Sequence, residues 1–299
     1  MFFDKTVLLK ILLVILSLTI FVGIFLFAYY AMFDDDTDAF SEVYVEDEEI
    51  RVHFIDVGQG DCALIETPSG NMLIDAGAPE SKKDIVKYID SLDISEFEYA
   101  IFTHPHSDHI GSATYLLNNY TFKNVILPDA ISNSKLYEDM LDTLESKNCN
   151  VILGEVGKSF TLDKATVSLF APSSYYYLDD LNDLSVVAKL TYKDVSFLFT
   201  GDAENFSERE MIKHGENLSA DILKVAHHGS NSSSHAAFLE AVNPGVAIIS
   251  AAKFNDYGHP HDEVIERLEK INADIYVTYE VGSIIVSTDG TEYNVSTKK

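Results

Sequence analysis

The pattern of hydrophobic and polar positions divides the 299-residue chain into three parts. Residues 11–33 carry no charge, and residues 34–49 are rich in acids. From residue 50 onward, short apolar runs alternate with segments in which apolar residues recur every three or four positions. The short runs predict strands and the periodic segments predict helices. This alternation predicts an α/β domain over 50–299, in which two mixed sheets pack face to face under outer helices as a four-layer αββα sandwich.

The predicted elements follow one another closely along this domain. Strands are expected at 50–57, 62–67, 71–77, 98–104, 123–128, 150–156, 159–163, 165–172, 185–192, 194–200, 220–226, 245–250, 273–279, 283–288 and 292–296. Helices are expected at 81–92, 133–146, 206–215, 234–242 and 261–271.

The uncharged segment 11–33 predicts a transmembrane helix. At ~1.5 Å per residue it reaches about 34 Å, enough to cross a bilayer. A cleaved secretory signal is the alternative, although its apolar part is normally shorter and ends in a small-x-small site. Lys5 and Lys10 precede the segment, and the next basic residue is Arg51. We therefore expect residues 1–10 in the cytoplasm and a single-pass signal anchor in the cell membrane, with the rest of the chain extracellular.

The acidic composition limits the classes of partner. Residues 34–49 hold nine acids and no base, which predicts a solvated linker. Asp and Glu total 48 against 21 Lys and Arg, for a formal net charge of -27. Such a surface repels a polyanion, so broad nucleic-acid binding is disfavoured. Two cysteines exclude a disulfide scaffold and a Cys-rich zinc site.

A dense histidine cluster follows the predicted strand 98–104. His104 and His106 alternate in an extended segment, so both side chains point the same way and can bind one metal ion. Asp108 and His109 come where the chain turns into a helix and can reach a second ion. Three imidazoles and a carboxylate in six residues are typical of transition-metal sites.

Two further strand ends carry potential ligands. Asp202 directly follows the strand 194–200 and can bridge two cations with its two oxygens, although capping of the next helix is an equal alternative. His227 and His228 follow the strand 220–226 and are expected to point to opposite sides, so that one is a ligand and the other supports the site or faces the substrate. His228 is slightly favoured.

Taken together, the motifs resemble a known family. They are FIDVGQGDCALIETPSGNMLIDAG (54–77), THPHSDHIG (103–111), FTGDAE (199–204), KVAHHGS (224–230) and YGHPH (257–261). This ordered set resembles the metallo-β-lactamase fold. Within that fold it is similar to the hydrolase domain at the end of ComEC-type DNA-uptake channels and to its free-standing relatives.

The resemblance implies a site that binds two divalent ions, for which Zn²⁺ is the expected metal. It implies that the first ion binds His104 and His106, that the second binds Asp108, His109 and one of His227/His228, and that Asp202 lies between the ions. It also implies that Asp75 supports the site and that His259 faces the substrate as a catalytic residue. An ordinary loop histidine is the alternative for His259, because Gly258 and Pro260 mark a turn in any case.

One departure from the family concerns the first ion. Many members place a further histidine on it, but residues 110–201 contain none. The corresponding stretch 182–185, Asn-Asp-Leu-Ser, offers only weaker oxygen ligands, which makes Mn²⁺ plausible beside Zn²⁺.

These residues predict metal-assisted hydrolysis of an anionic phosphoester, a phosphodiester above all. Two divalent ions with Asp108 and Asp202 leave a positive spot and supply hydroxide at neutral pH, which Asp108 orients as a catalytic residue. Ser230 and Asp61 are candidate substrate contacts, with a helix cap and a tight turn as their respective alternatives. The competing functions are hydrolysis of a lactone, ester or amide, and a metal-stabilised, non-enzymatic module of a competence or transport assembly.

Overall fold

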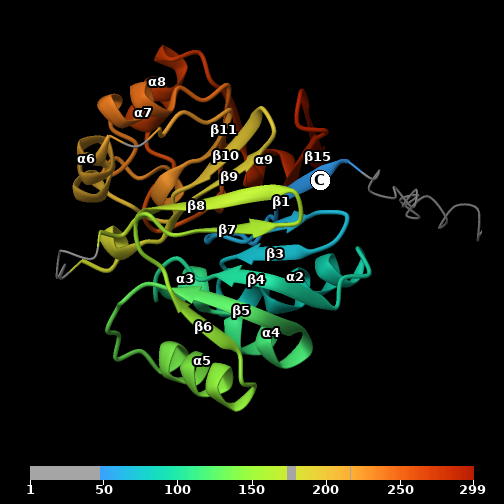
Figure 1. Ribbon diagram of the computed structural model, residues 1–299. Helices are drawn as coiled ribbons and strands as arrows, with labels where there is room; N and C mark the ends of the chain where they lie inside the picture. Colours follow the sequence, from blue (N-terminus) through green and yellow to red (C-terminus); the bar gives the residue numbers. More distant parts are fainter. Residues whose placement is uncertain (1–47, 174–179, 216) are drawn as a thin grey trace, which may run out of the picture. The chain divides into compact units, whose positions relative to one another are not determined.

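The computed structural model describes residues 48–173, 180–215 and 217–299. Fifteen strands in these ranges form two sheets (Figure 1). Within the same ranges no helix is both long and apolar enough to cross a membrane. The predicted signal anchor at 11–33 lies outside the described residues, as does the linker up to residue 47.

The larger sheet has eight strands, antiparallel at one end and parallel at the other. Its order is β15 (Tyr293–Lys298), β14 (Ser283–Thr288), β1 (Ile50–Phe54), β2 (Ala63–Glu66), β3 (Asn71–Ile74), β4 (Glu96–Ile101), β5 (Thr121–Leu127) and β6 (Asn150–Leu153). The pairs from β15 to β3 are antiparallel, and those from β3 to β6 are parallel.

The smaller sheet has seven strands and is likewise parallel at one end and antiparallel at the other. Its order is β13 (Asp274–Val277), β12 (Val246–Ile249), β11 (Ile222–Lys224), β10 (Val195–Phe199), β9 (Val187–Tyr192), β8 (Ala165–Ala171) and β7 (Ser159–Leu162). The pairs from β13 to β10 are parallel, and those from β10 to β7 are antiparallel.

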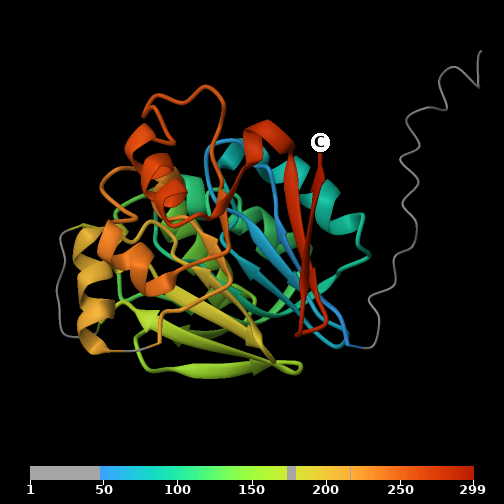
Figure 2. The same cartoon turned by 90° about the horizontal axis from the view of Figure 1, so that it is seen from above.

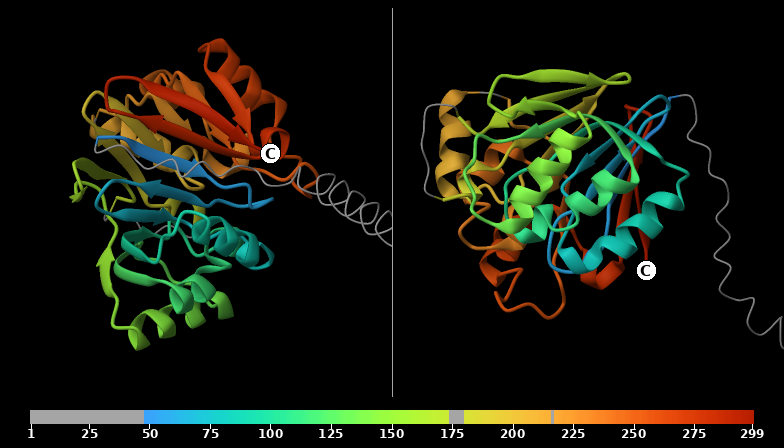
Figure 3. Two further views of the ribbon diagram at one scale, coloured as in Figure 1. Left: turned by 90° about the vertical axis from the view of Figure 1, so that its right-hand side faces the viewer. Right: turned by 90° about the horizontal axis from the view of Figure 1, so that it is seen from below.

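Helices cover the outer face of each sheet. The elements on the larger sheet are η2 (Pro79–Ser81), α2 (Lys82–Asp90), α3 (Ser107–Ile110), α4 (Ala113–Asn119) and α5 (Lys135–Ser146). Those of the smaller sheet are η3 (Asn182–Leu184), α6 (Asn205–His214), η4 (Ala226–Gly229), α7 (Ala236–Val242) and α8 (Asp262–Lys270), and α9 (Thr278–Val281) connects β13 to β14. Green α4 and α5 and orange α7 and α8 lie on opposite sides of the sheets (Figure 1; Figure 3, left), and Figure 2 shows the molecule from the side of α7 and α8.

Three apolar clusters hold these layers together. The central cluster lies between the sheets, where the rings of Phe54 and Phe199 stack with centroids 5.9 Å apart. A second joins the larger sheet to α2, α4 and α5, and a third joins the smaller sheet to α6, α7 and α8. Burial of apolar surface is the main favourable contribution to folding, so each interface stabilises the sandwich. The predicted two-sheet α/β fold is confirmed.

The structure differs from the predicted elements at two places. Residues 278–279 were expected to continue a strand but form the start of α9. Val277 is the last residue of β13 with a partner, because β12 ends at Ile249. Beyond that point an extended chain has no strand to pair with, and it turns into a helix. Helix α4 was not predicted, since its seven residues give less than two full turns of apolar periodicity.

Candidate metal centre

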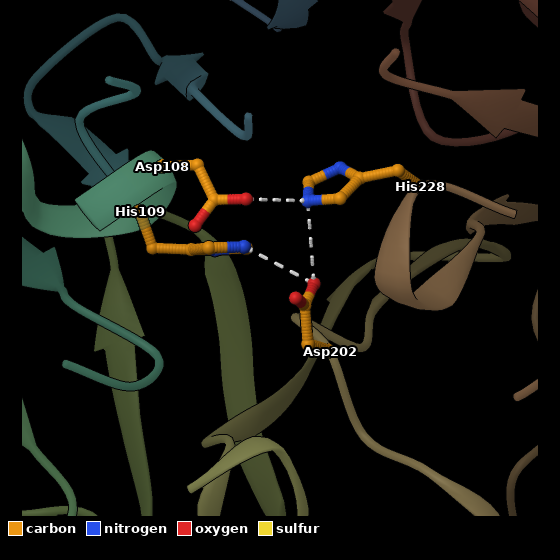
Figure 4. A group of neighbouring side chains, drawn as sticks. All are labelled: Asp108, His109, Asp202 and His228. Carbon is orange, nitrogen blue, oxygen red and sulfur yellow. Dashed lines mark hydrogen bonds and ion pairs between the residues drawn. The ribbon is translucent and has the colours of Figure 1, made fainter. Parts of the chain in front are cut away.

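The predicted ligands lie in loops that follow three strands. His104, His106, Asp108 and His109 come after β4 of the larger sheet, Asp202 after β10 and His228 after β11 of the smaller sheet. The parallel parts of the sheets thus present the carboxyl ends of their strands at one edge of the sandwich. Figure 4 shows four of these side chains, from three different loops, pointing toward one another.

Four side chains form what we call the second ligand group: Asp108, His109, Asp202 and His228. Each offers a ligand atom within 4.8 Å of the others. Nε2 of His228 lies 3.2 Å from Oδ2 of Asp108 and 3.8 Å from Oδ1 of Asp202, and Nε2 of His109 lies 3.1 Å from the same Oδ1 (Figure 4). Two carboxylates and two imidazoles that converge in this way form a ligand set for a divalent transition-metal ion.

The first ligand group consists of His104, His106 and Asp202. Nε2 of His104 is 3.0 Å from Nδ1 of His106 and 3.7 Å from Oδ2 of Asp202. Asp202 therefore presents Oδ1 to one group and Oδ2 to the other. The three loops bring all six predicted ligands into two adjoining clusters with one shared carboxylate.

The chemistry of the buried atoms fits a pair of cations. Among the described residues, Nε2 of His109 and Oδ1 of Asp202 are buried without a hydrogen-bond partner. Buried polar atoms normally have a partner, and an unpaired nitrogen beside an unpaired carboxylate oxygen needs an explanation such as an ion. Two divalent ions between these side chains would satisfy both atoms.

Carboxylates and a carbonyl orient the histidines of the second group from behind. Nδ1 of His109 lies 2.7 Å from Oδ2 of Asp75, and both oxygens of Asp75 also accept hydrogen bonds from Thr103. Nδ1 of His228 donates to the carbonyl oxygen of Ser250, at 3.0 Å, with Oδ1 of Asp61 at 3.2 Å. A partner on Nδ1 fixes the tautomer that leaves Nε2 free for a metal ion.

The electrostatics of the cluster favour charged carboxylates. Burial opposes the charge of Asp202, but the nearby His109 and His228 overcome this effect and hold its pKa well below the usual range. Burial likewise opposes the charge of Asp108, and the hydrogen bond from His228 lowers its pKa. Burial, followed by the charge of His109, lowers the pKa of His104 well below its usual value, so this imidazole is neutral. Although burial opposes it, Asp202 raises the pKa of His109 and raises that of His228 to about 9. A metal ion bound by these two rings would therefore displace a proton from each.

His227 and His228 do not have the strand geometry that was expected of them. Strand β11 ends at Lys224, and both histidines lie in the turn η4 with positive φ, 50° and 56°. The predicted opposite orientation is therefore wrong, because it assumed an extended backbone. Nε2 of His227 lies 3.7 Å from Oδ2 of Asp202, so both rings reach this carboxylate, on different oxygens.

His259 lies beside this histidine pair. Its ring centroid is 5.4 Å from that of His227 and 6.3 Å from that of His228. Asn255 holds the loop, since its side chain accepts from the His259 N–H and donates to the His259 carbonyl oxygen. Nδ1 of His259 is buried without a partner among the described residues. Burial, then the neighbouring His227, lowers the pKa of His259 to about 4.

The two predicted substrate contacts have different surroundings. The hydroxyl of Ser230 is paired with that of Ser232 at 2.8 Å, next to the histidine turn. Asp61 is 5% exposed, and its Oδ2 lies 2.7 Å from Nζ of Lys224. Lys224 is itself buried, at 4% exposed.

The stretch 182–185 holds loops together instead of offering metal ligands. Oδ1 of Asp183 accepts from the backbone N–H groups of Glu204 and Ser207 and so caps α6. The hydroxyl of Ser185 contacts Nδ1 of His104 and accepts from the N–H of Asp202. The weak oxygen ligands expected here are thus corrected to supporting residues. Asp183, and not Asp202, takes the capping role that was the alternative for Asp202.

Sequence reasoning missed Glu204, which ends the motif FTGDAE. Its Oε1 lies 3.0 Å from Nδ1 of His227 and also accepts from Ser232 and Asn182. The sequence signal was an acid two residues after Asp202, which could have been interpreted as a partner for a histidine. The missed residue gives His227 the same kind of support that Asp75 gives His109.

Residues 55–253 match the family model of the metallo-β-lactamase superfamily. This match covers more than half of the chain, and the chain belongs to this superfamily. Its cluster of histidines and aspartates is compatible with two divalent metal ions.

The relatives of the chain are of the ComEC type. It is 30% identical over 257 residues to ComE operon protein 3 of Bacillus subtilis (strain 168), which covers 79% of this chain and 33% of the relative. It is 28% identical over 227 residues to competence protein ComA of Neisseria gonorrhoeae, with 75% and 30% covered. The chain spans about a third of the length of these curated relatives. The predicted resemblance to ComEC-type proteins is confirmed.

Solved structures share the fold at low sequence identity. YhfI of Bacillus subtilis, a metallo-β-lactamase fold protein, aligns with a TM-score of 0.55 and 14% identity over 81% of this chain and 100% of its own. CmlA of Streptomyces venezuelae, a diiron β-hydroxylase, aligns with a TM-score of 0.53 and 14% identity over 76% and 52%. At such identities the likeness concerns the fold alone.

Proposed function

We propose that this chain is a hydrolase that cleaves phosphoesters, phosphodiesters above all, at two divalent ions, Zn²⁺ or else Mn²⁺. The observation that carries this proposal is the placement of Asp202, whose two oxygens face two separate ligand groups. Two bound ions would supply a water of lowered pKa and a Lewis acid for the ester oxygen. The superfamily membership supports hydrolysis as the reaction class.

The surrounding residues have distinct roles in this proposal. Asp108 is the most exposed side chain of the second ligand group, at 28%, and orients the attacking water. His259, whose ring centroid lies 5.4 Å from that of His227, hydrogen-bonds a phosphoryl oxygen or the leaving group. Ser230 is 6% exposed and its hydroxyl is paired with that of Ser232, which supports a positioning role beside the histidine turn in place of the substrate contact predicted from sequence. The burial of Asp61 supports a positioning role behind His228 in place of the substrate contact predicted from sequence.

The charge distribution favours a small anionic ester over a polymer. Two divalent ions outweigh the charges of Asp108 and Asp202, so the centre attracts an anion inside a chain of net charge -27. A duplex would need several basic contacts to its phosphates. Lys224, next to the site in sequence, is buried and paired with Asp61 and gives none.

The location of the enzyme is part of the proposal. The apolar segment 11–33 with Lys5 and Lys10 before it favours a membrane anchor with the hydrolase domain outside. Protease treatment of intact cells should remove the domain and leave a cytoplasmic marker protein untouched. Resistance of the domain in intact cells, with digestion after lysis, would contradict the extracellular orientation.

A substrate panel tests the proposed reaction. The full chain, loaded with Zn²⁺ or Mn²⁺, is assayed on bis-p-nitrophenyl phosphate, a phosphomonoester, a lactone, a β-lactam and single-stranded DNA, with Asp202→Ala as the blank. We expect turnover of the phosphodiester that the blank lacks. Cleavage of the lactone or lactam with no phosphoester turnover would contradict the proposal and favour hydrolysis of a lactone, ester or amide. Loading with two ions and no turnover of any compound would favour the non-enzymatic module.

A further inference from the structure

The first ligand group contains one side chain fewer than the second. His104, His106 and Asp202 have ligand atoms within 4.8 Å of one another, while the second group has four members. Residues 110–201 contain no histidine that could complete the first group. Structural and catalytic zinc sites have at least three protein ligands, and a fourth protein group closes the coordination sphere. One further side chain beside the first group would complete the ligand set of the first ion.

His227 stands next to the first group on the side of Asp202. Its Nε2 is 3.7 Å from Oδ2 of Asp202, the oxygen that Nε2 of His104 approaches at the same distance. The two imidazoles therefore approach one carboxylate oxygen, whereas His228 and His109 approach the other. The adjacent histidines of η4 are divided between the two oxygens of Asp202 and so between the two groups.

The support of the His227 ring resembles that of a metal ligand. Its Nδ1 lies 3.0 Å from Oε1 of Glu204, which leaves Nε2 free. Glu204 is itself fixed by hydrogen bonds from Ser232 at 2.9 Å and Asn182 at 3.2 Å. Metal-binding histidines commonly have a carboxylate on the second ring nitrogen, as His109 has Asp75 here. A carboxylate held by two further residues orients the ring.

The backbone of η4 places both rings at the centre at an energetic cost. His227, His228 and Gly229 have positive φ in succession, 50°, 56° and 82°. Left-handed backbone is unfavourable for residues with a side chain and is typical of functional sites. The N–H of His227 donates to the carbonyl oxygen of Gly201, which ties the turn to the loop that carries Asp202. An ordinary strand end would direct only one of the two rings to the centre.

From these contacts we infer that His227 is the further ligand of the first ion, so that two adjacent histidines serve two different divalent ions. This assignment rests on the proposed two-ion function. The ring is 22% exposed and would complete the ligand set of the first ion through Nε2. Glu204 is a positioning residue that acts through His227.

Metal content and Co²⁺ absorption of the full chain test this assignment. Wild type, His227→Ala, His106→Ala, His228→Ala and the exposed control His214→Ala are dialysed against buffered Co²⁺ and measured for ions per chain. We expect about two ions per chain in wild type and control, and about one in each of the other three. The spectrum left in His227→Ala should match that of His106→Ala and differ from that of His228→Ala, because ligand number and type set the absorption.

A positioning variant sharpens the test. Glu204→Gln should lower the affinity for the first ion roughly 10- to 100-fold and leave the affinity for the second ion unchanged. If His227→Ala does not fold, judged by its circular dichroism, His227→Asn takes its place. If the His227 variant binds two ions with wild-type affinity and spectrum, the assignment of His227 is wrong, while the proposed two-ion function stands. Fewer than two ions in wild type would instead contradict the proposed function, and the assignment with it.

Discussion

The two ligand groups share Asp202 but differ in how the protein supports their histidines. The second group buries its histidines to 0–1% side-chain exposure and supports them with Asp75, Asp61 and a backbone carbonyl. The first group has hydroxyl groups of Thr103 and Ser185 behind His104. Preorganised, well-supported ligands hold a metal ion more tightly. On these contacts we expect the second ion to be held more firmly than the first.

The largest expected effect comes from removing the residue that both groups share. Asp202→Ala takes one ligand from each group and leaves His109 facing an uncompensated site, so neither ion should bind well. We expect kcat/KM to fall by roughly 10⁴-fold, the scale seen when a member of a catalytic set is lost. Ion content and turnover should fall together in the same preparation. Full loading with lost turnover would show that Asp202 does not link the groups.

A pH-dependent contribution to stability is expected from Glu208, which holds the loop behind the histidine turn. Its carboxylate accepts from the backbone N–H groups of Ser234 and His235. Burial raises the pKa of Glu208 from the ordinary 4.5 to about 7, against the effect of these donors.

Since the folded pKa lies above the unfolded one, this contribution is present below pH 4.5 and lost as the pH rises through 7. The full contribution of Glu208 to the free energy of unfolding is about 3 kcal/mol. Urea unfolding of wild type between pH 4.5 and 8 should show this decrease, and Glu208→Gln should lack it. An equal pH slope in both proteins would contradict the role of Glu208.

The support of the second group is tested by Asp75→Asn. The amide keeps the shape of Asp75 but removes the charge beside Nδ1 of His109. Affinity for the second ion should fall roughly 10- to 100-fold, with the first ion little affected. Competition with a chelator measures both affinities. Equal weakening of the two ions would mean that the groups are not independently supported.

The smallest effect is expected from Ser185→Ala in the first group. Its hydroxyl contacts Nδ1 of His104 and accepts from the N–H of Asp202. Loss of a neutral hydrogen bond costs about 1 kcal/mol, which corresponds to roughly fivefold in affinity for the first ion. Calorimetric titration with Mn²⁺ or Zn²⁺ provides the value. A larger loss than in Asp75→Asn would reverse the comparison between the groups.

The fold could be predicted well from the sequence because its strands are short and separated by clear helical or turn segments. The strands predicted at 185–192 and 194–200 leave only Lys193 between them, and this residue has the positive φ of 51° typical of a tight hairpin turn. The strand–helix switch at Thr278 could not be predicted, since it depends on where the neighbouring β12 ends. The length of a neighbouring strand is set by tertiary structure, which the local strand propensity of a sequence does not contain.

The candidate ligands and their division between the two groups were predicted from the motifs and the family resemblance, but the directions of His227 and His228 were not. The spacing of His104 and His106 in an extended segment predicted that they converge, and their nitrogens lie 3.0 Å apart. The positive φ of His227 and His228 has no simple sequence signal, so strand alternation gave the wrong directions. The role of Glu204 depends on a contact across 23 residues that only the folded chain reveals.

The most direct test of the central claim is a crystal structure of the metal-loaded chain with anomalous diffraction data collected at the Zn or Mn absorption edge. The account predicts two anomalous peaks, one beside each ligand group, with the carboxylate of Asp202 in contact with both. A single peak, or two peaks of which Asp202 contacts only one, would contradict the shared two-ion centre.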